Sequence, residues 1–367
     1  MKHVRFIMLG GFLGAGKTTT LVQVARHYQG RGLKVGIITN DQANNLVDTH
    51  TFRDQGMAAE EIPGGCFCCR FDALTEAAGR LSAAERPDIL LAEPVGSCTD
   101  LVATVVQPLK RLYQDQYHVA PYAVLVDPVR VRKILTGDRQ GGFSPKVAYI
   151  FHKQLEEADA IAVNKVDTLG PAERDQLAAL IARHFPSAEV LHFSARTGEG
   201  LDKLLAFVER AGRYGRNIPE VDYDTYAEGE AELGWLNCTC TLSASSPFAA
   251  DDLLLAFART IQQALKADGA EVAHLKMLLH ASGKTTIANL VRGDAQPELS
   301  QRSGLTEKHA ELIVNARVHT DPEALSATVE RCLADVCRAH GLQVALGMNQ
   351  HFKPGRPVPT HRYAEAV

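Results

Sequence analysis

The sequence lacks the long apolar runs of a membrane protein. No stretch reaches the roughly 18–20 consecutive apolar residues that a membrane-spanning helix needs. The apolar run at 4–9 leads straight into a glycine-rich loop that a cleaved leader would remove, so we expect no signal peptide. Cysteine is also scarce, with 8 in 367 residues, far below the roughly 8–10% of a disulfide scaffold. We therefore expect a cytoplasmic protein that does not act on a membrane.

Acidic and basic residues are nearly balanced in number. The chain has 39 basic and 43 acidic residues, a net charge of −4, and no long run of either sign. A nucleic-acid-binding protein usually carries a basic patch, so we expect no nucleic-acid partner. Hydrophobic residues at 46% and charged residues at 22% are ordinary for a globular protein.

Short apolar runs alternate with helical patterns over the first 215 residues. The runs lie at 4–9, 35–39, 88–93, 122–127, 160–164 and 189–194. Apolar strands that alternate with helices predict an α/β domain with a mainly parallel sheet and helices on both faces. Ligands in such domains bind at the carboxyl ends of the strands. We place this first domain at 1–215.

The pattern changes after residue 215. Residues 216–232 are acidic and polar and are interpreted as a linker. Residues 233–352 interleave helical stretches with alternating strands, which predicts a smaller α+β C-terminal domain in the ferredoxin-like style. Residues 353–367 are rich in proline and are expected to form an extended tail.

Residues 11–18 read GFLGAGKT and fit the phosphate-binding pattern G-x-x-x-x-G-K-[ST], between a predicted strand and a predicted helix. Such a loop surrounds phosphates with backbone N–H groups at a helix N-terminus, so the first domain is predicted to be a P-loop NTPase. Lys17 is expected to neutralise the β- and γ-phosphates, and the Thr18 hydroxyl to bind magnesium. The nucleotide-binding residues of this loop are predicted to be Gly14, Ala15, Gly16, Lys17, Thr18 and Thr19.

A second GKTT, at 283–286, has no glycine at the first position of the pattern and lies between two strand-like runs. We therefore predict a hairpin turn there without a nucleotide role.

The run at 160–164 ends in N-K-x-D. A carboxylate at Asp167 can accept hydrogen bonds from guanine N1–H and the exocyclic amine, whereas adenine has an acceptor at N1. Asn164 can bond the other edge of the base, and the stem of Lys165 can lie along the ring. Backbone donors at Ser194 and Ala195 can reach the base oxygen. The pattern predicts GTP rather than ATP, with an ordinary strand exit as the alternative.

The run at 88–93 ends at Glu93, an acid at a strand tip, which is a candidate for holding magnesium. The Gly96 N–H is a candidate sensor of the γ-phosphate. Asp41 follows the second run and is a candidate for magnesium or for positioning the attacking water. A turn-forming Asn-Asp pair is the alternative interpretation of Asp41. Together with Lys17, these residues make up the predicted catalytic set.

Three of the cysteines fall within GGCFCC at 64–69. Thiolates favour zinc, cobalt and other transition metals, so Cys66, Cys68 and Cys69 are predicted metal ligands. Three sulfurs leave one position of a four-coordinate shell open, which suits transfer of the metal better than structural holding. The alternative is a set of buried, small apolar side chains. We also expect a γ-phosphate-driven loop change to alter the thiolate geometry.

The phosphate loop, C-x-C-C, Glu-x-x-Gly and N-K-x-D, in this order, resemble the CobW-like GTPases, relatives of the urease and hydrogenase maturation GTPases. The resemblance implies a GTP-dependent metallochaperone that hydrolyses GTP slowly until a client metalloenzyme or cofactor-assembly protein stimulates it. It also implies a possible homodimer.

The chain departs from this family at several positions. Asp41 stands where a glutamate is usual, and Pro94 removes a backbone donor from the switch. Cys98 follows that switch and is a candidate fourth ligand, with a structural thiol as the alternative. A histidine-rich stretch is missing, and His351 and His361 in the C-terminal part are the remaining histidine candidates.

Three alternatives keep the motifs but change the function. The first is a P-loop kinase for a small molecule, which the N-K-x-D pattern disfavours. The second is a metal sensor or scaffold in which the nucleotide is only a structural ligand. The third is a GTPase whose cysteines form a redox switch.

Overall fold

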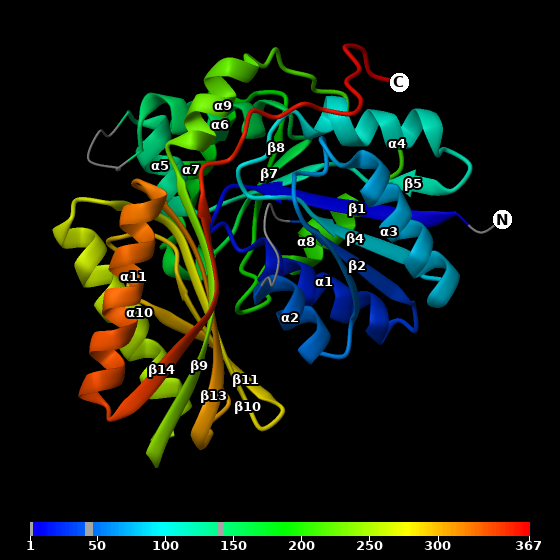
Figure 1. The fold of residues 1–367 in the computed structure, drawn as a ribbon. Helices are drawn as coiled ribbons and strands as arrows, with labels where there is room; N and C mark the ends of the chain where they lie inside the picture. The colour runs from blue at the N-terminus through cyan, green and yellow to red at the C-terminus, as the bar shows by residue number, and fades with distance from the viewer. Residues whose placement is uncertain (1–2, 41–46, 138–142) are drawn as a thin grey trace. The chain divides into compact units, whose positions relative to one another are not determined.

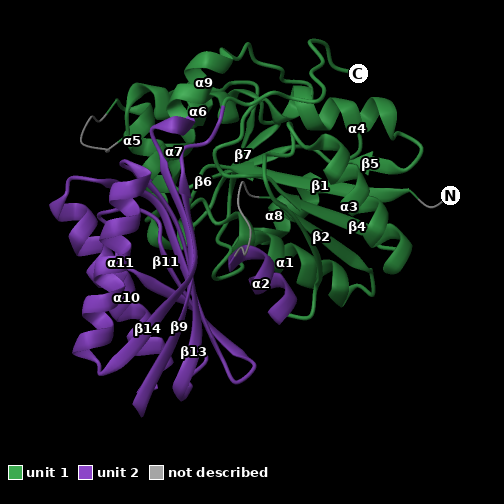
Figure 2. Ribbon diagram, viewed as in Figure 1, with its two compact units in different colours: residues 1–42, 55–229, 356–367 green, residues 43–54, 230–355 purple. Residues whose placement is uncertain are grey.

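The computed structural model describes residues 3–40, 47–137 and 143–367. The chain divides into two compact units, shown in Figure 2. Unit 1 comprises Met1–Gln42, Gln55–Gly229 and Arg356–Val367, and unit 2 comprises Ala43–Asp54 and Glu230–Gly355. Two segments therefore belong to a different unit from their neighbours in sequence, namely 43–54 and 356–367. The stretch 216–232, expected to be a linker, contains the helix α9 (Tyr223–Ala231).

Unit 1 is built on a parallel sheet, and the predicted α/β fold is confirmed (Figure 1). The strand order is β3-β2-β4-β1-β6-β7-β8, and β5 pairs with β1. The strands are β1 (Val4–Gly11), β2 (Val35–Asn40), β3 (Ala58–Ile62), β4 (Ile89–Glu93), β5 (Tyr117–Val119), β6 (Ala123–Val126), β7 (Ala160–Val163) and β8 (Glu189–His192). Every residue of β2, β4, β6 and β7 is buried, because helices cover both faces of the sheet.

The helices of unit 1 connect these strands. They are α1 (Lys17–Gly30), α3 (Phe71–Ala84), α4 (Gln107–Leu112), α5 (Pro128–Leu135), α6 (Pro145–Glu156), α7 (Pro171–His184), α8 (Leu201–Val208) and α9. A π-helical turn, η1 (Val102–Val106), leads directly into α4. No helix among the described residues is long and apolar enough to cross a lipid bilayer.

The order of four neighbouring strands decides which loops meet. In the run β3-β2-β4-β1 all strands are parallel, so their carboxyl ends lie at one edge of the sheet. Thr39 of β2 is level with Glu93 of β4, and Asn40 is level with Ile62 of β3. The cysteine loop after β3, the segment after β4 and the phosphate loop after β1 therefore all start from this edge.

Unit 2 has a six-stranded antiparallel sheet in the order β12-β11-β10-β13-β9-β14. Its strands and long helices are β9 (Gly234–Ala249), α10 (Ala250–Ala267), β10 (Glu271–Ala281), β11 (Lys284–Leu290), β12 (Glu298–Gln301), β13 (Thr306–His319), α11 (Pro322–Ala339) and β14 (Leu342–Phe352). Without the β11–β12 pair, the order of elements is βαββαβ and the strand order is the ferredoxin-like one. The predicted ferredoxin-like style is therefore confirmed.

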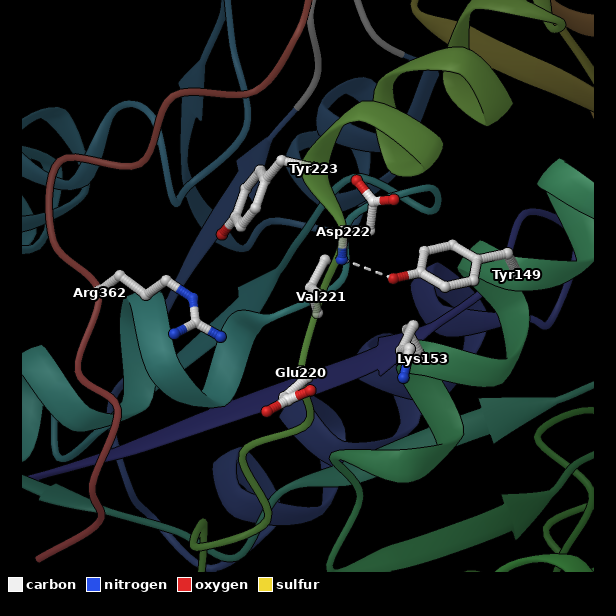
Figure 3. Close-up of a pocket in the computed structure, with 7 residues that line it drawn as sticks. All are labelled: Tyr149, Lys153, Glu220, Val221, Asp222, Tyr223 and Arg362. Atoms are coloured by element: carbon white, nitrogen blue, oxygen red, sulfur yellow. Dashed lines mark hydrogen bonds between the residues drawn. The ribbon is translucent and has the colours of Figure 1, made fainter.

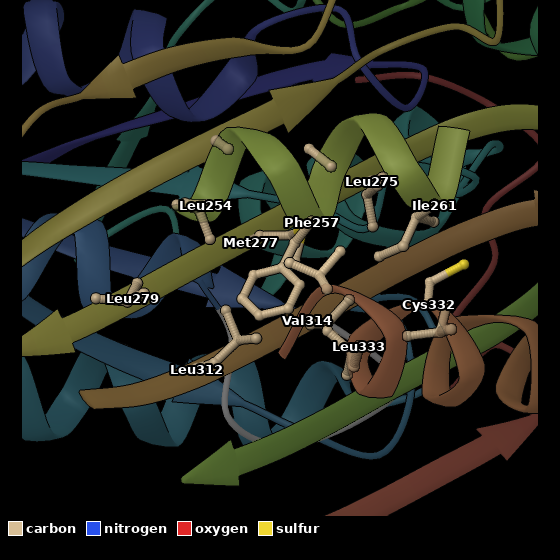
Figure 4. Close-up of a cluster of buried hydrophobic side chains, with 14 of the residues drawn as sticks. Leu254, Phe257, Ile261, Leu275, Met277, Leu279, Leu312, Val314, Cys332 and Leu333 are labelled. Atoms are coloured by element: carbon tan, nitrogen blue, oxygen red, sulfur yellow. The ribbon is translucent and has the colours of Figure 1, made fainter. Parts of the chain in front are cut away.

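The main core of unit 2 lies between the two long helices and one face of the sheet (Figure 4). Leu254, Phe257 and Ile261 recur at helical spacing along α10 and pack on Met277 and Leu279 of β10. The remaining four cysteines, Cys238, Cys240, Cys332 and Cys337, are buried in this core.

Helix α2 (Val47–Asp54) covers part of the other face of the same sheet. Val47 packs with Leu278, Ile287 and Ile313, whose positions alternate with those of the main core. The Val47 N–H donates to Asn315 Oδ1 at 3.0 Å. A segment that follows β2 of unit 1 in sequence is thus part of the packing of unit 2.

The GKTT stretch forms the predicted hairpin. Ala281 of β10 pairs with Lys284 of β11, which leaves Ser282 and Gly283 as a two-residue turn. Both have positive φ, 47° and 73°, as a type I′ turn requires. The prediction of a turn at this site is confirmed.

Candidate functional site

The loop between β1 and α1 has the backbone conformation of a phosphate-binding loop. Gly14 and Gly16 have φ values of 79° and 93°, which favour glycine. A Cβ atom at Gly16 would lie 2.4 Å from Asn164 Nδ2, so the loop touches the predicted base-reading segment. Helix α1 begins at the next residue, so its free N–H groups face this loop. Ala15 is buried, and Thr19 is exposed in the first turn of α1.

Two side chains at the start of α1 are held by hydrogen bonds to neighbouring strands. Lys17 Nζ donates to the Gly11 carbonyl at 2.9 Å. Thr18 Oγ1 donates to Glu93 Oε1, also at 2.9 Å. Lys17, Thr18 and Glu93 are all buried. The structure therefore brings together the predicted phosphate-binding lysine and both predicted magnesium ligands.

The segment after Glu93 lies against the phosphate loop. A Cβ atom at Gly96 would come within 3.0 Å of the Leu13 backbone nitrogen, so only glycine allows this approach. Gln154 Nε2 donates to the Gly96 carbonyl at 2.9 Å and holds the segment from α6. The predicted γ-phosphate sensor is thus adjacent to the phosphate loop. Asp41, the remaining member of the predicted catalytic set, lies outside the described residues.

The N-K-x-D segment packs on the phosphate loop from the other side. Asn164 Nδ2 donates to the Ala15 carbonyl at 2.9 Å. Asn164 Oδ1 accepts from the Ala195 N–H at 2.9 Å. Lys165 Nζ donates to the Gly14 carbonyl at 2.9 Å. These bonds place the predicted base-reading side chains next to the predicted phosphate-binding backbone.

Asp167 is positioned by the loop that follows β8. Its carboxylate accepts from Ser194 Oγ at 2.6 Å and pairs with Arg196. Burial acts to raise the pKa of Asp167, but the bonds from Ser194 and Arg196 outweigh it and hold the pKa below its ordinary value. The Ser194 N–H donates to the Glu199 carbonyl. Ser194 therefore acts here through its hydroxyl rather than through the expected backbone donor.

Two residues that bond to the nucleotide-binding segments, Asp127 and Arg130, were not predicted from the sequence. Asp127 follows the strand β6, caps α5 by accepting from the Val129 and Arg130 N–H groups, and accepts from Lys165 Nζ at 2.8 Å. The Arg130 guanidinium donates to the Leu13 carbonyl of the phosphate loop at 2.6 Å. The available signal for Asp127 was an acid at the end of an apolar run, the same signal that identified Glu93.

The three predicted metal ligands form a compact sulfur cluster. Cys66 Sγ lies 2.7 Å from Cys68 Sγ and 3.3 Å from Cys69 Sγ, and the Cys68–Cys69 sulfur distance is 3.6 Å. A zinc ion with bonds of about 2.3 Å spaces tetrahedral sulfurs about 3.8 Å apart, so a small opening of the cluster would fit the ion. Cys66 and Cys68 are buried, and Cys69 is half-buried. The donor type and spacing fit zinc or cobalt.

The cysteine loop is shaped by glycine and held by Asn40. Gly64 and Gly65 have φ values of 79° and 147°, and the chain then turns through a bond from the Cys69 N–H to the Cys66 carbonyl. Asn40 Nδ2, at the end of β2, donates to the Gly65 carbonyl at 2.6 Å. The end of β2 is therefore bonded directly to the loop that carries the sulfurs.

The thiols of this cluster differ in acidity. Hydrogen bonds from Cys68, then Cys69 and Cys98, lower the pKa of Cys66. The same cluster bonds raise the pKa of Cys68, and the bond to Cys66 raises the pKa of Cys69 to about 11. A metal ion bound by these thiols would displace the protons that they carry.

The C-terminal segment Arg356–Val367 belongs to unit 1 and runs over the cysteine loop. The Val358 N–H donates to Cys69 Sγ at 3.2 Å, and the Thr360 N–H to the Cys68 carbonyl at 2.9 Å. The ring of His361 packs edge-to-face on Phe71, with the ring centroids 5.2 Å apart. The segment thus supports the loop through its backbone.

The same segment borders a hollow of about 680 Å³ (Figure 3). The hollow is lined by Tyr149, Lys153, Glu220, Val221, Asp222, Tyr223 and Arg362. Its cations are neutralised within the protein, since Lys153 pairs with Glu156 and Arg362 with the buried Asp100. Neither the phosphate loop nor the sulfur cluster contributes to it.

Comparisons with known proteins find a family model and several relatives. Residues 5–192 match the family model described as CobW/HypB/UreG, nucleotide-binding domain. The zinc chaperone YeiR of Escherichia coli (strain K12) is 28% identical over 177 residues, which are 46% of this chain and 49% of that protein. The zinc chaperone YjiA of the same organism is 27% identical over 191 residues, 50% of this chain and 56% of that protein.

One further relative and one solved structure match very different shares of the chain. The zinc-regulated GTPase metalloprotein activator 1 of Dictyostelium discoideum is 34% identical over 104 residues, 24% of this chain and 21% of that protein. The crystal structure of Zn(II)-bound YjiA GTPase from E. coli matches at 18% identity over 90% of this chain and 99% of that one, with a TM-score of 0.41. The chain spans about half the length of the two E. coli chaperones that it matches in sequence.

Proposed function

Because the chain belongs to the CobW/HypB/UreG family, we propose that it is a GTP-hydrolysing metallochaperone that binds zinc or cobalt through its cysteine loop and passes the metal to a client metalloenzyme or cofactor-assembly protein. One observation carries the proposal. The phosphate loop and the sulfur cluster start from the same edge of one sheet, on the strands β1 and β3 of the run β3-β2-β4-β1. A nucleotide and a metal bound there would share the segments between them.

The hydrogen bonds that join the phosphate loop to the N-K-x-D segment and to Glu93 support the nucleotide-binding part of the proposal. Asp167 and Asn164 would read guanine, and the first turn of α1 would hold the phosphates. Water attacks the γ-phosphorus and the bond to the β–γ bridging oxygen breaks, while the Lys17 ammonium neutralises charge on the phosphate oxygens. Magnesium, held by Thr18 and Glu93, would supply further positive charge there. Asp41 is retained as a candidate for orienting the water, with the Gly96 N–H as a candidate donor to the γ-phosphate.

Phosphate release from GTP tests this half. We expect slow release from wild type and none above background from Lys17→Ala, with thermal unfolding as a check of folding. In a base-specificity test, Asp167→Asn exchanges an acceptor for a donor, so the variant loses GTP binding and gains xanthosine triphosphate binding, since xanthine has an oxygen in place of the amine. Equal binding of ATP and GTP by wild type would contradict the proposed base recognition.

The metal half rests on three thiols within hydrogen-bonding distance of one another. All eight cysteines are free thiols, which supports a reducing compartment such as the cytoplasm. We expect one zinc or cobalt ion per chain, lost in Cys68→Ser, with Cys240→Ser as a matched control because Cys240 is buried in the core of unit 2. Oxidation of the thiols without metal binding would favour the redox switch instead, a reading that the 2.7 Å contact between Cys66 and Cys68 also permits.

Delivery requires that the nucleotide changes the metal affinity. Asn40 and the segment after Glu93 connect the strand ends to both sites, so a γ-phosphate is expected to shift the zinc affinity. Zinc titrations of the same preparation with GDP and with a non-hydrolysable GTP analogue measure this shift, and equal affinities would remove the coupling. Sedimentation of the metal-loaded protein tests for a homodimer. Capture experiments with the same metal-loaded protein identify the client.

A further inference from the structure

Cys98 is a fourth sulfur in contact with the cluster. It lies five residues after Glu93, and its side chain is 1% exposed. Its thiol is a hydrogen-bond partner of the Cys66 and Cys68 thiols. The sulfurs that all lie within 4.8 Å of one another are those of Cys66, Cys68 and Cys69, so the Cys98 sulfur has to move closer to at least one of them to complete a four-sulfur site. The cysteines in the core of unit 2 contact apolar side chains, whereas Cys98 contacts the sulfurs that are proposed to bind metal. The sequence left Cys98 as either a fourth ligand or a structural thiol, because some thirty residues separate it from the cysteine loop.

The backbone around Cys98 is held in a defined position. Gln154 Nε2 donates to the Cys98 carbonyl at 2.8 Å as well as to the Gly96 carbonyl. The Cys98 N–H donates to the Val95 carbonyl at 3.0 Å and closes a turn. Asp100 has a φ of 64°, and its carboxylate is buried and bonded to Tyr223 Oη at 2.6 Å. A non-glycine residue with positive φ is costly, and it persists only where the surroundings hold it.

We propose that Cys98 is the fourth thiolate of the metal site, so that the closed site is a four-cysteine, tetrahedral site formed by Cys66, Cys68, Cys69 and Cys98. This inference rests on the proposed metal function and specifies its ligand set. Four thiolates satisfy a tetrahedral ion without water, and each thiol releases its proton on binding. The open position expected from the cysteine loop alone is thereby filled from the segment that follows β4.

The fourth ligand has a mechanical consequence. Gly96 packs on Leu13 of the phosphate loop, and Cys98 is two residues further along the same held segment. A metal bound by Cys98 therefore joins the cysteine loop to the segment that carries the predicted γ-phosphate sensor. Withdrawal of Cys98 would return the site to three sulfurs, a form from which a client ligand could take the ion.

The ligand number can be counted on the full-length protein loaded with one equivalent of zinc or cobalt. X-ray absorption at the zinc edge is expected to show four sulfurs per metal in wild type and three sulfurs with one lighter atom in Cys98→Ser. The thiolate-to-cobalt charge-transfer band should fall by about one quarter in the same variant, because one of four sulfurs is lost. Loss of an outer-shell partner already costs roughly 10–100-fold in metal affinity, so loss of a ligand should weaken zinc binding at least tenfold.

Two controls separate the possible failures. Cys240→Ser should keep four sulfurs, and thermal unfolding of Cys98→Ser verifies that the variant folds. Three sulfurs in wild type, with a spectrum unchanged by Cys98→Ser, would overturn the inference and leave the three-cysteine metal site intact. If Cys98→Ser fails to fold, the number of sulfurs per metal in the wild-type protein decides between a three-cysteine and a four-cysteine site. Absence of stoichiometric metal from wild type would instead refute the proposed metal function and this inference with it.

Discussion

Replacement of Asp127 by asparagine tests whether the ion pair with Lys165 organises the nucleotide site. Asp127 Oδ2 accepts from Lys165 Nζ at 2.8 Å, and the two side chains are 4% and 28% exposed. Asparagine keeps an oxygen for the Val129 and Arg130 N–H groups, so the start of α5 remains capped. The substitution therefore removes charge at this position with little change of shape.

The expected magnitude follows from the burial of the pair. A hydrogen bond to a charged group contributes roughly 1.5–3 kcal/mol, and the partial exposure of Lys165 reduces this to about 1–2 kcal/mol. At 1.4 kcal/mol per tenfold change, the GDP affinity of Asp127→Asn should fall by roughly 5–30-fold. The bond from Lys165 to the Gly14 carbonyl remains, so binding is weakened rather than abolished.

Calorimetric titration of GDP into wild type and Asp127→Asn measures the change, and thermal unfolding of both proteins without nucleotide shows how much of it is lost stability. Glu209→Gln is the matched control, because it breaks a surface pair with Arg31 whose contribution is expected to be under about 1 kcal/mol. A double substitution with Lys165→Met isolates the pairwise contribution. A GDP affinity within about twofold of wild type, together with an unchanged unfolding temperature, would refute the assigned role of Asp127.

Three further substitutions have defined expectations. Gly16→Ala should weaken GDP binding more than about tenfold. A left-handed backbone costs a non-glycine residue about 1–2 kcal/mol, and the new Cβ would clash with the Asn164 side chain. An unchanged GDP affinity would contradict the described loop geometry. Phe257→Ala should lower the free energy of unfolding by about 3–5 kcal/mol in denaturant titrations, because the ring is fully buried in the core of unit 2, and a loss below about 1 kcal/mol would disagree with that packing. Burial raises the pKa of Glu157 well above its ordinary value, so its contribution to stability is complete below the unfolded pKa and is lost as the pH rises through the folded pKa. In Glu157→Gln this loss should disappear, so unfolding temperatures compared between about pH 5 and pH 8 should fall less than in wild type; identical pH slopes would argue against a protonated Glu157.

Local patterns were sufficient for most elements and motifs. The six apolar runs of the first domain are strands, and those that form β2, β4, β6 and β7 are buried throughout, because a strand that is covered on both faces needs an unbroken apolar sequence. The hairpin at Ser282–Gly283 was predictable because a two-residue turn between strands has a local signature. Two edge strands, β3 and β14, lack this signal. β3 reads AAEEI and is mostly half-buried, and β14 has half-buried and exposed residues with one buried residue at its start, so neither has the apolar pattern on which the predictions depend.

The candidate site was predictable where a motif is continuous in sequence, as in the phosphate loop, N-K-x-D and C-x-C-C. Asp127 and Arg130 were missed because their roles consist of contacts to Lys165 and Leu13, which are distant in the chain. The C-terminal segment is in the same way tied to unit 1 by hydrogen bonds to the cysteine loop, about 290 residues away, from the Val358 N–H to Cys69 Sγ and from the Thr360 hydroxyl to the Cys69 carbonyl. No local periodicity encodes such contacts.

From its amino acids alone, then, the chain could be placed in a fold class, and its nucleotide-binding and sulfur motifs could be located, because each depends on residues that are neighbours in sequence. Strand order and side-chain packing were needed to show that these motifs share one sheet edge, that Cys98 reaches the other sulfurs and that α2 packs within unit 2. The physical reason is that the order of parallel strands is settled by the burial of whole faces, and that burial brings together residues that the sequence keeps far apart.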